Sequence, residues 1–123
     1  MGLQIVEPTD VNDRIERKET FVVNVVTAWC PDCTERQSQH IDAFVQHLNE
    51  QHIDVFQVNV QMTKGVFISE AHETLTNRFG GHGYPRTVLI KEGVIADKDN
   101  VEVITETGLS DLSSKFIKLV QVL

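Results

Sequence analysis

Residues 21–33, FVVNVVTAWCPDC, run from a hydrophobic segment directly into a pair of cysteines. The first six residues are mostly apolar and β-branched, which is typical of a strand covered on both faces. Cys30 and Cys33 are the only cysteines of the chain, and they are separated by Pro31 and Asp32. Because helical periodicity starts at Thr34, the pair is predicted to lie where a buried strand ends and a helix begins.

This position favours thiol chemistry. The N–H groups at a helix N-terminus are unpaired and stabilise an anion, so a thiolate placed there becomes a good nucleophile. Residues i and i+3 of a first turn have Cβ atoms roughly 5–6 Å apart, and a disulfide needs roughly 3.5–4.5 Å, so a small adjustment closes the bond. Pro31 fits this turn without losing a hydrogen bond. We expect Cys30 to attack a substrate disulfide and Cys33 to resolve the mixed disulfide.

Zinc binding is the alternative for two cysteines at this spacing. A structural zinc site needs four ligands, and the cysteines supply half of them. Histidines are available, but none forms a second close pair with another ligand; they are His40, His47, His52, His72 and His82. Two of them, His40 and His47, flank an apolar stripe and are interpreted as solvated helix residues. The sequence therefore favours a redox-active pair, with no metal.

Size and charge limit the other function classes. The 123 residues suit one domain, 1–123, and the net charge of −7 disfavours a nucleic-acid partner. No apolar run approaches the roughly 20 residues that span a bilayer, so we expect no membrane association. The N-terminal residues lack the pattern of a signal peptide. We therefore expect a cytoplasmic monomer, in a reducing compartment where a lone cysteine pair is more often catalytic or metal-binding than structural.

Hydrophobic periodicity predicts alternating helices and strands along the chain. The first predicted helix is short and runs from the Thr9-Asp10 cap to about Lys18, and the second starts at Thr34 and has the apolar stripe Ile41, Phe44, Val45 and Leu48. The third is capped by Ser69, has Ala71, Leu75 and Phe79 on one stripe, and is ended by Gly80-Gly81. The fourth is capped by Ser110 and has the stripe Leu112, Phe116, Leu119, Val120 and Leu123. The other predicted elements are strands 21–26, 53–60 and 87–90, an irregular segment 61–68, a hairpin turn 91–93 and its partner strand 101–107.

This order predicts an α/β fold. The strand–helix–strand unit of residues 21–60 requires parallel strands, and the turn at 91–93 adds a C-terminal hairpin. The expected architecture is a mixed central β-sheet, with a parallel core and helices on both faces.

These residues resemble the thioredoxin superfamily over essentially the whole chain. The resemblance is carried by the strand that ends in Trp29-Cys30-Pro31-Asp32-Cys33, by Gly83-Tyr84-Pro85 before a later strand, by the turn at 91–93, and by Gly108 near the last helix. It implies the thioredoxin fold and a thiol–disulfide oxidoreductase, most simply one that reduces protein or small-molecule disulfides without a bound cofactor. A thioredoxin-fold adaptor or redox-sensor module is the alternative.

The resemblance also implies roles for individual residues. Pro85 matches a cis-proline that faces the cysteines, and the backbone of Tyr84 would hydrogen-bond an extended substrate segment. Trp29 and Pro31 would belong to the same substrate-binding surface. Without the cysteines, the Gly-x-Pro sequence would be interpreted as an ordinary loop. A reductase that uses NADPH, or glutathione, would restore the dithiol.

The chain also departs from the family's pattern. Asn24 and Gln57 stand where thioredoxins usually have a buried Asp and a Lys, and we expect a neutral amide pair that replaces the ion pair structurally but not as a base. Asp32 either relays a proton to or from Cys33 or is a first-turn acid that favours the helix dipole. Arg86 places a cation near the site, where it could lower the pKa of Cys30, pair with Asp32 or bind an acidic substrate. The alternative is that its side chain points to solvent. The segment 61–69 is long and is a candidate for shaping specificity.

Overall fold

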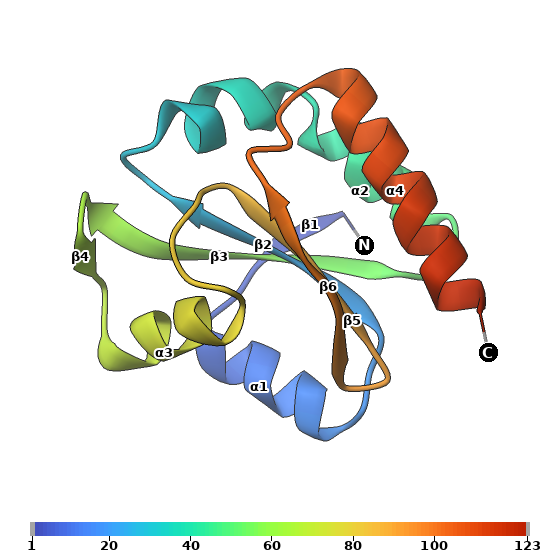
Figure 1. Ribbon diagram of the computed structural model, residues 1–123, viewed down its shortest axis with the longest axis horizontal. Coiled ribbons are helices and arrows are strands. Elements are labelled where there is room, and N and C mark those ends of the chain that lie inside the picture. Colours follow the sequence, from blue (N-terminus) through green and yellow to red (C-terminus); the bar gives the residue numbers. More distant parts are fainter. Residues whose placement is uncertain (1, 123) are drawn as a thin grey trace.

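A mixed β-sheet forms the centre of the protein (Figure 1), for which the computed structural model describes residues 2–122. Within these residues the sheet has six strands, in the order β1-β3-β2-β5-β6, with β4 paired to β3. Strand β3 runs parallel to both β1 and β2, and the other pairings are antiparallel. The strands are β1 Leu3–Ile5, β2 Phe21–Thr27, β3 Asp54–Thr63, β4 Val66–Phe67, β5 Arg86–Lys91 and β6 Val94–Val101.

Two α-helices cover each face of the sheet (Figure 1). Helices α1 (Pro8–Glu16) and α3 (Glu70–Arg78) pack on one face, and α2 (Ile41–Asn49) and α4 (Glu106–Gln121) pack on the other. All seven residues of β2 are buried, because the strand lies between its neighbours and beneath helices on both sides. The predicted fold class is therefore confirmed, including the parallel pairing of β2 with β3.

Alternation along the strands divides the apolar side chains into two cores. On the α1/α3 face, Phe21 packs edge-to-face against Phe56, with ring centroids 5.7 Å apart. On the α2/α4 face, Phe44 and Phe116 form a similar pair at 6.4 Å. Each fully buried aromatic or aliphatic side chain contributes about 1.5–3 kcal/mol. The two cores hold the helices on the sheet and thereby place the cysteine segment.

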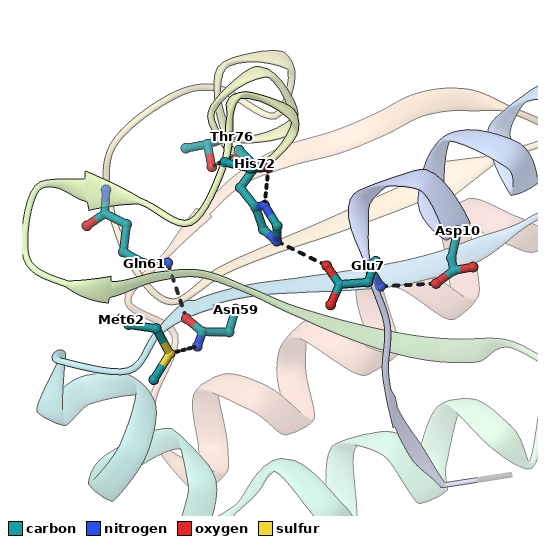
Figure 2. A network of polar contacts seen from close by, with 8 residues as sticks. Glu7, Asp10, Asn59, Gln61, Met62, His72 and Thr76 are labelled. Atoms are coloured by element: carbon teal, nitrogen blue, oxygen red, sulfur yellow. Dashed lines mark hydrogen bonds and ion pairs between the residues drawn. The ribbon is translucent and has the colours of Figure 1, made fainter.

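The N-terminal elements differ from the prediction. Strand β1 was not predicted, because three partly exposed residues carry no recognisable period and gain stability only by pairing with β3. Helix α1 begins at Pro8, and Glu7 is its N-cap instead of Thr9-Asp10. The Glu7 N–H donates to Asp10 Oδ2 at 3.1 Å, which closes a capping box (Figure 2). The helix ends at Glu16, two residues before the predicted end at Lys18, which has a positive φ.

The single helix predicted from Thr34 is divided into three pieces. A π-helical turn (Asp32–Arg36) and a 3₁₀ turn (Gln37–Gln39) precede α2. Side chains explain the irregularity, because Thr34 and Ser38 both donate to the carbonyl four residues earlier, at 3.2 and 2.7 Å. Such bonds compete with the regular backbone ladder.

The segment predicted as irregular is a second hairpin. Strand β3 continues to Thr63 and pairs with β4 through a turn at Gly65, where φ is +81°. The following helix α3 starts after Ser69 as predicted, but the Ser69 hydroxyl bonds to His72 Nδ1 at 2.8 Å instead of capping the backbone. The predicted apolar stripe is also corrected, because Ala71 is exposed and His72 is buried in its place, with Nε2 3.2 Å from Glu7 (Figure 2).

In the C-terminal part the predicted hairpin turn is present, but the strand that follows it and the cap of the last helix differ from the prediction. Glu92 and Gly93 both have positive φ, so the hairpin is a two-residue turn and its partner strand is β6, Val94–Val101, not 101–107. This edge strand was missed because half of its residues are polar and none of them is buried. Helix α4 is capped by Thr105, which accepts a bond from the Gly108 N–H at 3.0 Å, and not by Ser110.

The C-terminal helix also contains the last predicted apolar stripe. Leu112 and Phe116 are buried, and Leu119 and Val120 pack against the same core. Leu123, the remaining residue of that prediction, lies outside the described residues. Among the helices of residues 2–122, none has the length and apolar character needed to cross a membrane.

Candidate active site at the cysteine pair

The two cysteines lie at the C-terminal end of β2, where the chain enters the π-helical turn. Both are free thiols, with 9% of Cys30 and 7% of Cys33 exposed. The N–H groups of Cys33 and Thr34 both donate to the carbonyl of Cys30 at 3.0 Å, so the turn starts at the first cysteine. This arrangement agrees with the predicted strand-to-helix junction.

The two thiols open onto different hollows of the surface. Cys30 lines a groove of about 370 Å³ together with Trp29, Tyr84 and the β3–β4 hairpin. Cys33 lines a separate cavity of about 460 Å³ on the inner side of the turn. A substrate that enters the groove therefore meets Cys30, which is the geometry required of the attacking thiol.

The loop before β5 lies against Cys30. The Tyr84–Pro85 peptide bond is cis, as the resemblance implied. The Cys30 thiol donates a long hydrogen bond to the carbonyl of Tyr84, at 3.9 Å between sulfur and oxygen. Two segments 54 residues apart in sequence thus form the two sides of the groove.

Trp29 is held in place by the β3–β4 hairpin. Its indole N–H donates to Gln61 Oε1 at 2.9 Å, and the same oxygen accepts the Gly65 N–H at 3.0 Å. The ring also meets Tyr84 edge-to-face, with centroids 6.2 Å apart, and Lys64 Nζ lies 5.3 Å from its centroid. Sequence reasoning missed Gln61, although a polar residue next to an apolar strand is a recognisable signal.

Asp32 is engaged by a neighbouring cation. Its Oδ1 accepts a hydrogen bond from Arg36 Nη1 at 2.6 Å, as an i, i+4 ion pair on a half-exposed turn. Within residues 2–122 no hydrogen bond joins Asp32 to Cys33. The geometry favours the reading of Asp32 as a first-turn acid, and the proton-relay role stays a prediction.

Arg86 is buried, which corrects the readings that placed it toward solvent or beside Asp32. Only 6% of the residue is exposed. Its guanidinium donates to the carbonyls of Lys98 at 3.0 Å and His82 at 2.7 Å, so it joins β6 to the loop before β5. Gly80 leaves room for this group, because a Cβ there would lie 2.6 Å from Nη1. Arg86 is therefore a structural residue of the loop that faces Cys30.

Burial gives Cys33 its chemical character. Removal from water raises the pKa of Cys33 from 9.0 to about 12, and the neighbouring Cys30 adds to the increase. The backbone and side chain of Thr27 act in the opposite direction. Cys33 is consequently a protonated thiol near neutral pH and has to lose a proton before it can attack. Burial likewise raises the pKa of Tyr84.

A cluster of side-chain amides lies between the sheet and the helical turn that carries Cys33. Gln57 donates to Asn24 Oδ1 at 2.9 Å, so the expected amide pair is present. Asn24 in turn donates to Gln37 Oε1 at 3.0 Å and to the Thr87 hydroxyl at 3.4 Å. Gln37 was missed, although it follows Cys33 by four residues on the same face of the turn. None of these amides can take up a proton.

Metal coordination is not supported by the arrangement of potential ligands. Among the described residues, no group of three or more His, Cys, Asp or Glu side chains could hold a metal ion.

Comparison with known proteins shows which solved structures share this fold. No protein-family model and no curated protein sequence matches the chain. Solved structures do match, among them Fasciola hepatica thioredoxin, with 18% identity over 92% of this chain and 98% of that chain and a TM-score of 0.67. Oxidised thioredoxin from Plasmodium falciparum is 16% identical over 94% and 98% of the two chains, with a TM-score of 0.68. A complex of ferredoxin:thioredoxin reductase and thioredoxin f2 matches at 13% identity over 98% and 96%, with a TM-score of 0.66.

Proposed function

We propose that this chain, which has the fold of thioredoxins, is a thiol–disulfide oxidoreductase that reduces protein or small-molecule disulfides. The observation that carries the proposal is the unequal placement of the two thiols. Cys30 opens onto a groove bounded by the cis Tyr84–Pro85 loop, whereas Cys33 lines a separate cavity and is a protonated thiol. This is the division between an attacking and a resolving cysteine.

The proposed reaction has two exchange steps. The Cys30 thiolate attacks one sulfur of the substrate disulfide, and the other substrate sulfur leaves as a thiolate. Cys33 then loses its proton and attacks Cys30, which releases the second substrate thiolate and leaves the Cys30–Cys33 disulfide. Two electrons pass from the cysteine pair to the substrate. The backbone of Tyr84, with Trp29 and Pro31, would position the substrate segment.

The electron donor is proposed by chemistry and by analogy. A reductase that uses NADPH, or glutathione, would return the pair to the dithiol, and the cysteines would need no further cofactor. A structural neighbour in complex with ferredoxin:thioredoxin reductase supports a reductase partner for this fold in general. A monomer that acts in the cytoplasm would meet such donors, since that compartment keeps thiols reduced.

Mechanism-based trapping tests the proposal. Cys33→Ser should accumulate mixed disulfides on Cys30, identified by mass spectrometry of proteins captured from a lysate, because the resolving step is removed. Cys30→Ser is the matched control and should capture none, since the raised pKa of Cys33 keeps that thiol protonated. Reduction of insulin disulfides should fall to background in both variants. Insulin reduction by Cys30→Ser at the wild-type rate would contradict the proposal.

A further inference from the structure

The hydroxyl of Thr27 is one of the buried polar groups near the cysteines that lack a hydrogen-bond partner, together with the Tyr84 hydroxyl and Arg86 Nε. Thr27 is the last residue of β2 and is 0% exposed. Its Oγ1 makes no hydrogen bond of regular geometry among residues 2–122, although it lies close enough to Cys33 to lower the pKa of that thiol. A buried hydroxyl without a partner destabilises the folded state, so its position at the start of the cysteine segment requires an explanation.

The Thr27 side chain lies beside Cys33. Both residues line the cavity of about 460 Å³, together with Gln37 and Gln57 of the amide cluster. The register between β2 and β3 shifts at the step from Val26 to Thr27. The extra residue, Val60, lies in β3, and bulges of this kind are frequent next to active sites. Exposed residues of the turn also line the cavity, which therefore opens to solvent.

Few groups around Cys33 stabilise its thiolate. The titratable group that acts on it is Cys30, on the same turn, and Cys33 in turn raises the pKa of Tyr84. Neither brings a positive charge, and the nearby acid Asp32 is paired with Arg36. The groups that lower the pKa of Cys33 are the backbone and side chain of Thr27.

We propose that the Thr27 hydroxyl donates a hydrogen bond to the Cys33 thiolate while that thiolate resolves the mixed disulfide. This inference rests on the proposed disulfide exchange. A hydroxyl needs only to turn about its C–O bond, or about the Cα–Cβ bond, to direct its proton to a neighbouring sulfur. Its unpaired state in the dithiol is then the state of a donor whose acceptor forms only during the reaction.

Cys33 releases its proton to water in the open cavity, and the thiolate attacks the Cys30 sulfur of the mixed disulfide. The bond between Cys30 and the substrate sulfur breaks, the Cys30–Cys33 bond forms, and the substrate leaves as a thiolate that takes a proton from solvent. The Thr27 hydroxyl keeps its own proton throughout.

Three substitutions separate the hydroxyl from the shape of the side chain. Thr27→Val removes the hydroxyl at nearly constant volume, and Thr27→Ser keeps the hydroxyl but loses the methyl group. Thr27→Ala removes the hydroxyl with a smaller side chain and replaces Thr27→Val if the latter does not fold. The probe is dithiobis(nitrobenzoate), an aromatic disulfide that releases one coloured thiolate on attack by Cys30 and a second on resolution by Cys33.

Stopped-flow absorbance should show the second release slowed about 3- to 10-fold in Thr27→Val near neutral pH. Each unit of increase in the Cys33 pKa lowers the thiolate fraction about tenfold, and the greater nucleophilicity of a more basic thiolate returns roughly half of that on a logarithmic scale. Thr27→Ser should resolve close to the wild-type rate. The thermal unfolding midpoint of Thr27→Val should not fall, because an unpaired buried hydroxyl is removed.

The outcomes separate this inference from the proposed function. Resolution by Thr27→Val at the wild-type rate would overturn the role of Thr27, as would a Thr27→Ser variant as slow as Thr27→Val. A first release no faster than that of a free cysteine would instead overturn the proposed function of Cys30. In that case the second release still reports on Thr27 when the probe is in enough excess for attack to be faster than resolution.

Discussion

Neutral polar residues surround Cys33, and this is the main chemical feature of the site at the scale of single residues. Asn24, Gln37 and Gln57 form a hydrogen-bonded chain of amides where thioredoxins usually have an ion pair. Such a cluster satisfies buried polar groups without adding a charge. Our hypothesis remains that the amides replace the ion pair structurally but do not act as a base. Burial, together with the neighbouring Cys30, leaves Cys33 as a resolving cysteine whose proton is hard to remove.

The raised pKa of Cys33 predicts a loss of stability at alkaline pH. The unfolded chain loses the Cys33 proton near pH 9 and the folded state near pH 12, so the folded state binds more protons between these values and its stability falls as pH rises. Each pH unit costs about 1.4 kcal/mol. Between about pH 9 and pH 10.5 we therefore expect the free energy of unfolding to fall by about 2 kcal/mol more in the reduced wild type than in Cys33→Ala. Urea unfolding measures both, and equal losses in the two proteins would contradict the raised pKa.

The β3–β4 hairpin is the element that gives this site its own character. Gln61, which is 1% exposed, accepts hydrogen bonds from both Trp29 and Gly65, so it connects the turn of the hairpin to the groove of Cys30. Lys64 lies over the indole ring from the same turn. The hairpin thus forms one wall of the groove that we propose receives the substrate.

Removal of the Gln61 amide should loosen this wall. Gln61→Leu leaves the Trp29 N–H and the Gly65 N–H without their acceptor, which should lower the free energy of unfolding by about 1–3 kcal/mol. Trp29 is the only tryptophan of the chain, so its fluorescence emission should shift to longer wavelength as the ring gains water contact. Thr63→Ala, at an exposed position of the same hairpin, is the control and should change neither property. Unchanged emission and stability in Gln61→Leu would show that the hairpin does not hold Trp29.

The whole molecule is organised as two cores separated by one sheet. Ile90 belongs to the core beneath α1 and α3, and Ile41 belongs to the core beneath α2 and α4. Each core has its own aromatic pair, and no residue is shared between the two sets. Substitutions on opposite faces should therefore act independently.

Double-mutant cycles test this separation. Ile90→Val and Ile41→Val should each cost about 0.5–1.5 kcal/mol, and their sum should match the double variant within about 0.5 kcal/mol. The edge-to-face pair Phe44 and Phe116 is the contrast, since Phe44→Leu and Phe116→Leu remove partners of one contact and should show a coupling of about 0.5 kcal/mol or more. Urea unfolding provides all the values. A coupling across the sheet as large as the coupling within one core would contradict the independence of the faces.

The sequence by itself determined the features that neighbouring residues encode. The apolar run before Cys30, the helical period of α2, and the two-residue turn at Glu92-Gly93 were all recognisable, because a local conformation follows from adjacent side chains and their period. The same holds for the fold class, since the order of such elements restricts the possible topologies. The short strands β1 and β4 and the polar edge strand β6 were missed or misplaced, because their stability comes from pairing and not from their own residues.

Only the tertiary structure decided which buried polar groups meet. Gln61 reaches Trp29 across 32 residues, and Gln57 reaches Asn24 across 33 residues, through the register of β2 with β3. The burial of Arg86 depends on carbonyls from two other segments and on the space left at Gly80. Thr27 and Cys33 line one cavity together with residues of β1, β3 and α2. Such contacts are set by how whole elements pack. The sequence therefore predicts that a thiol pair is present, and only the packed fold decides which groups surround the Cys33 thiol when it loses its proton.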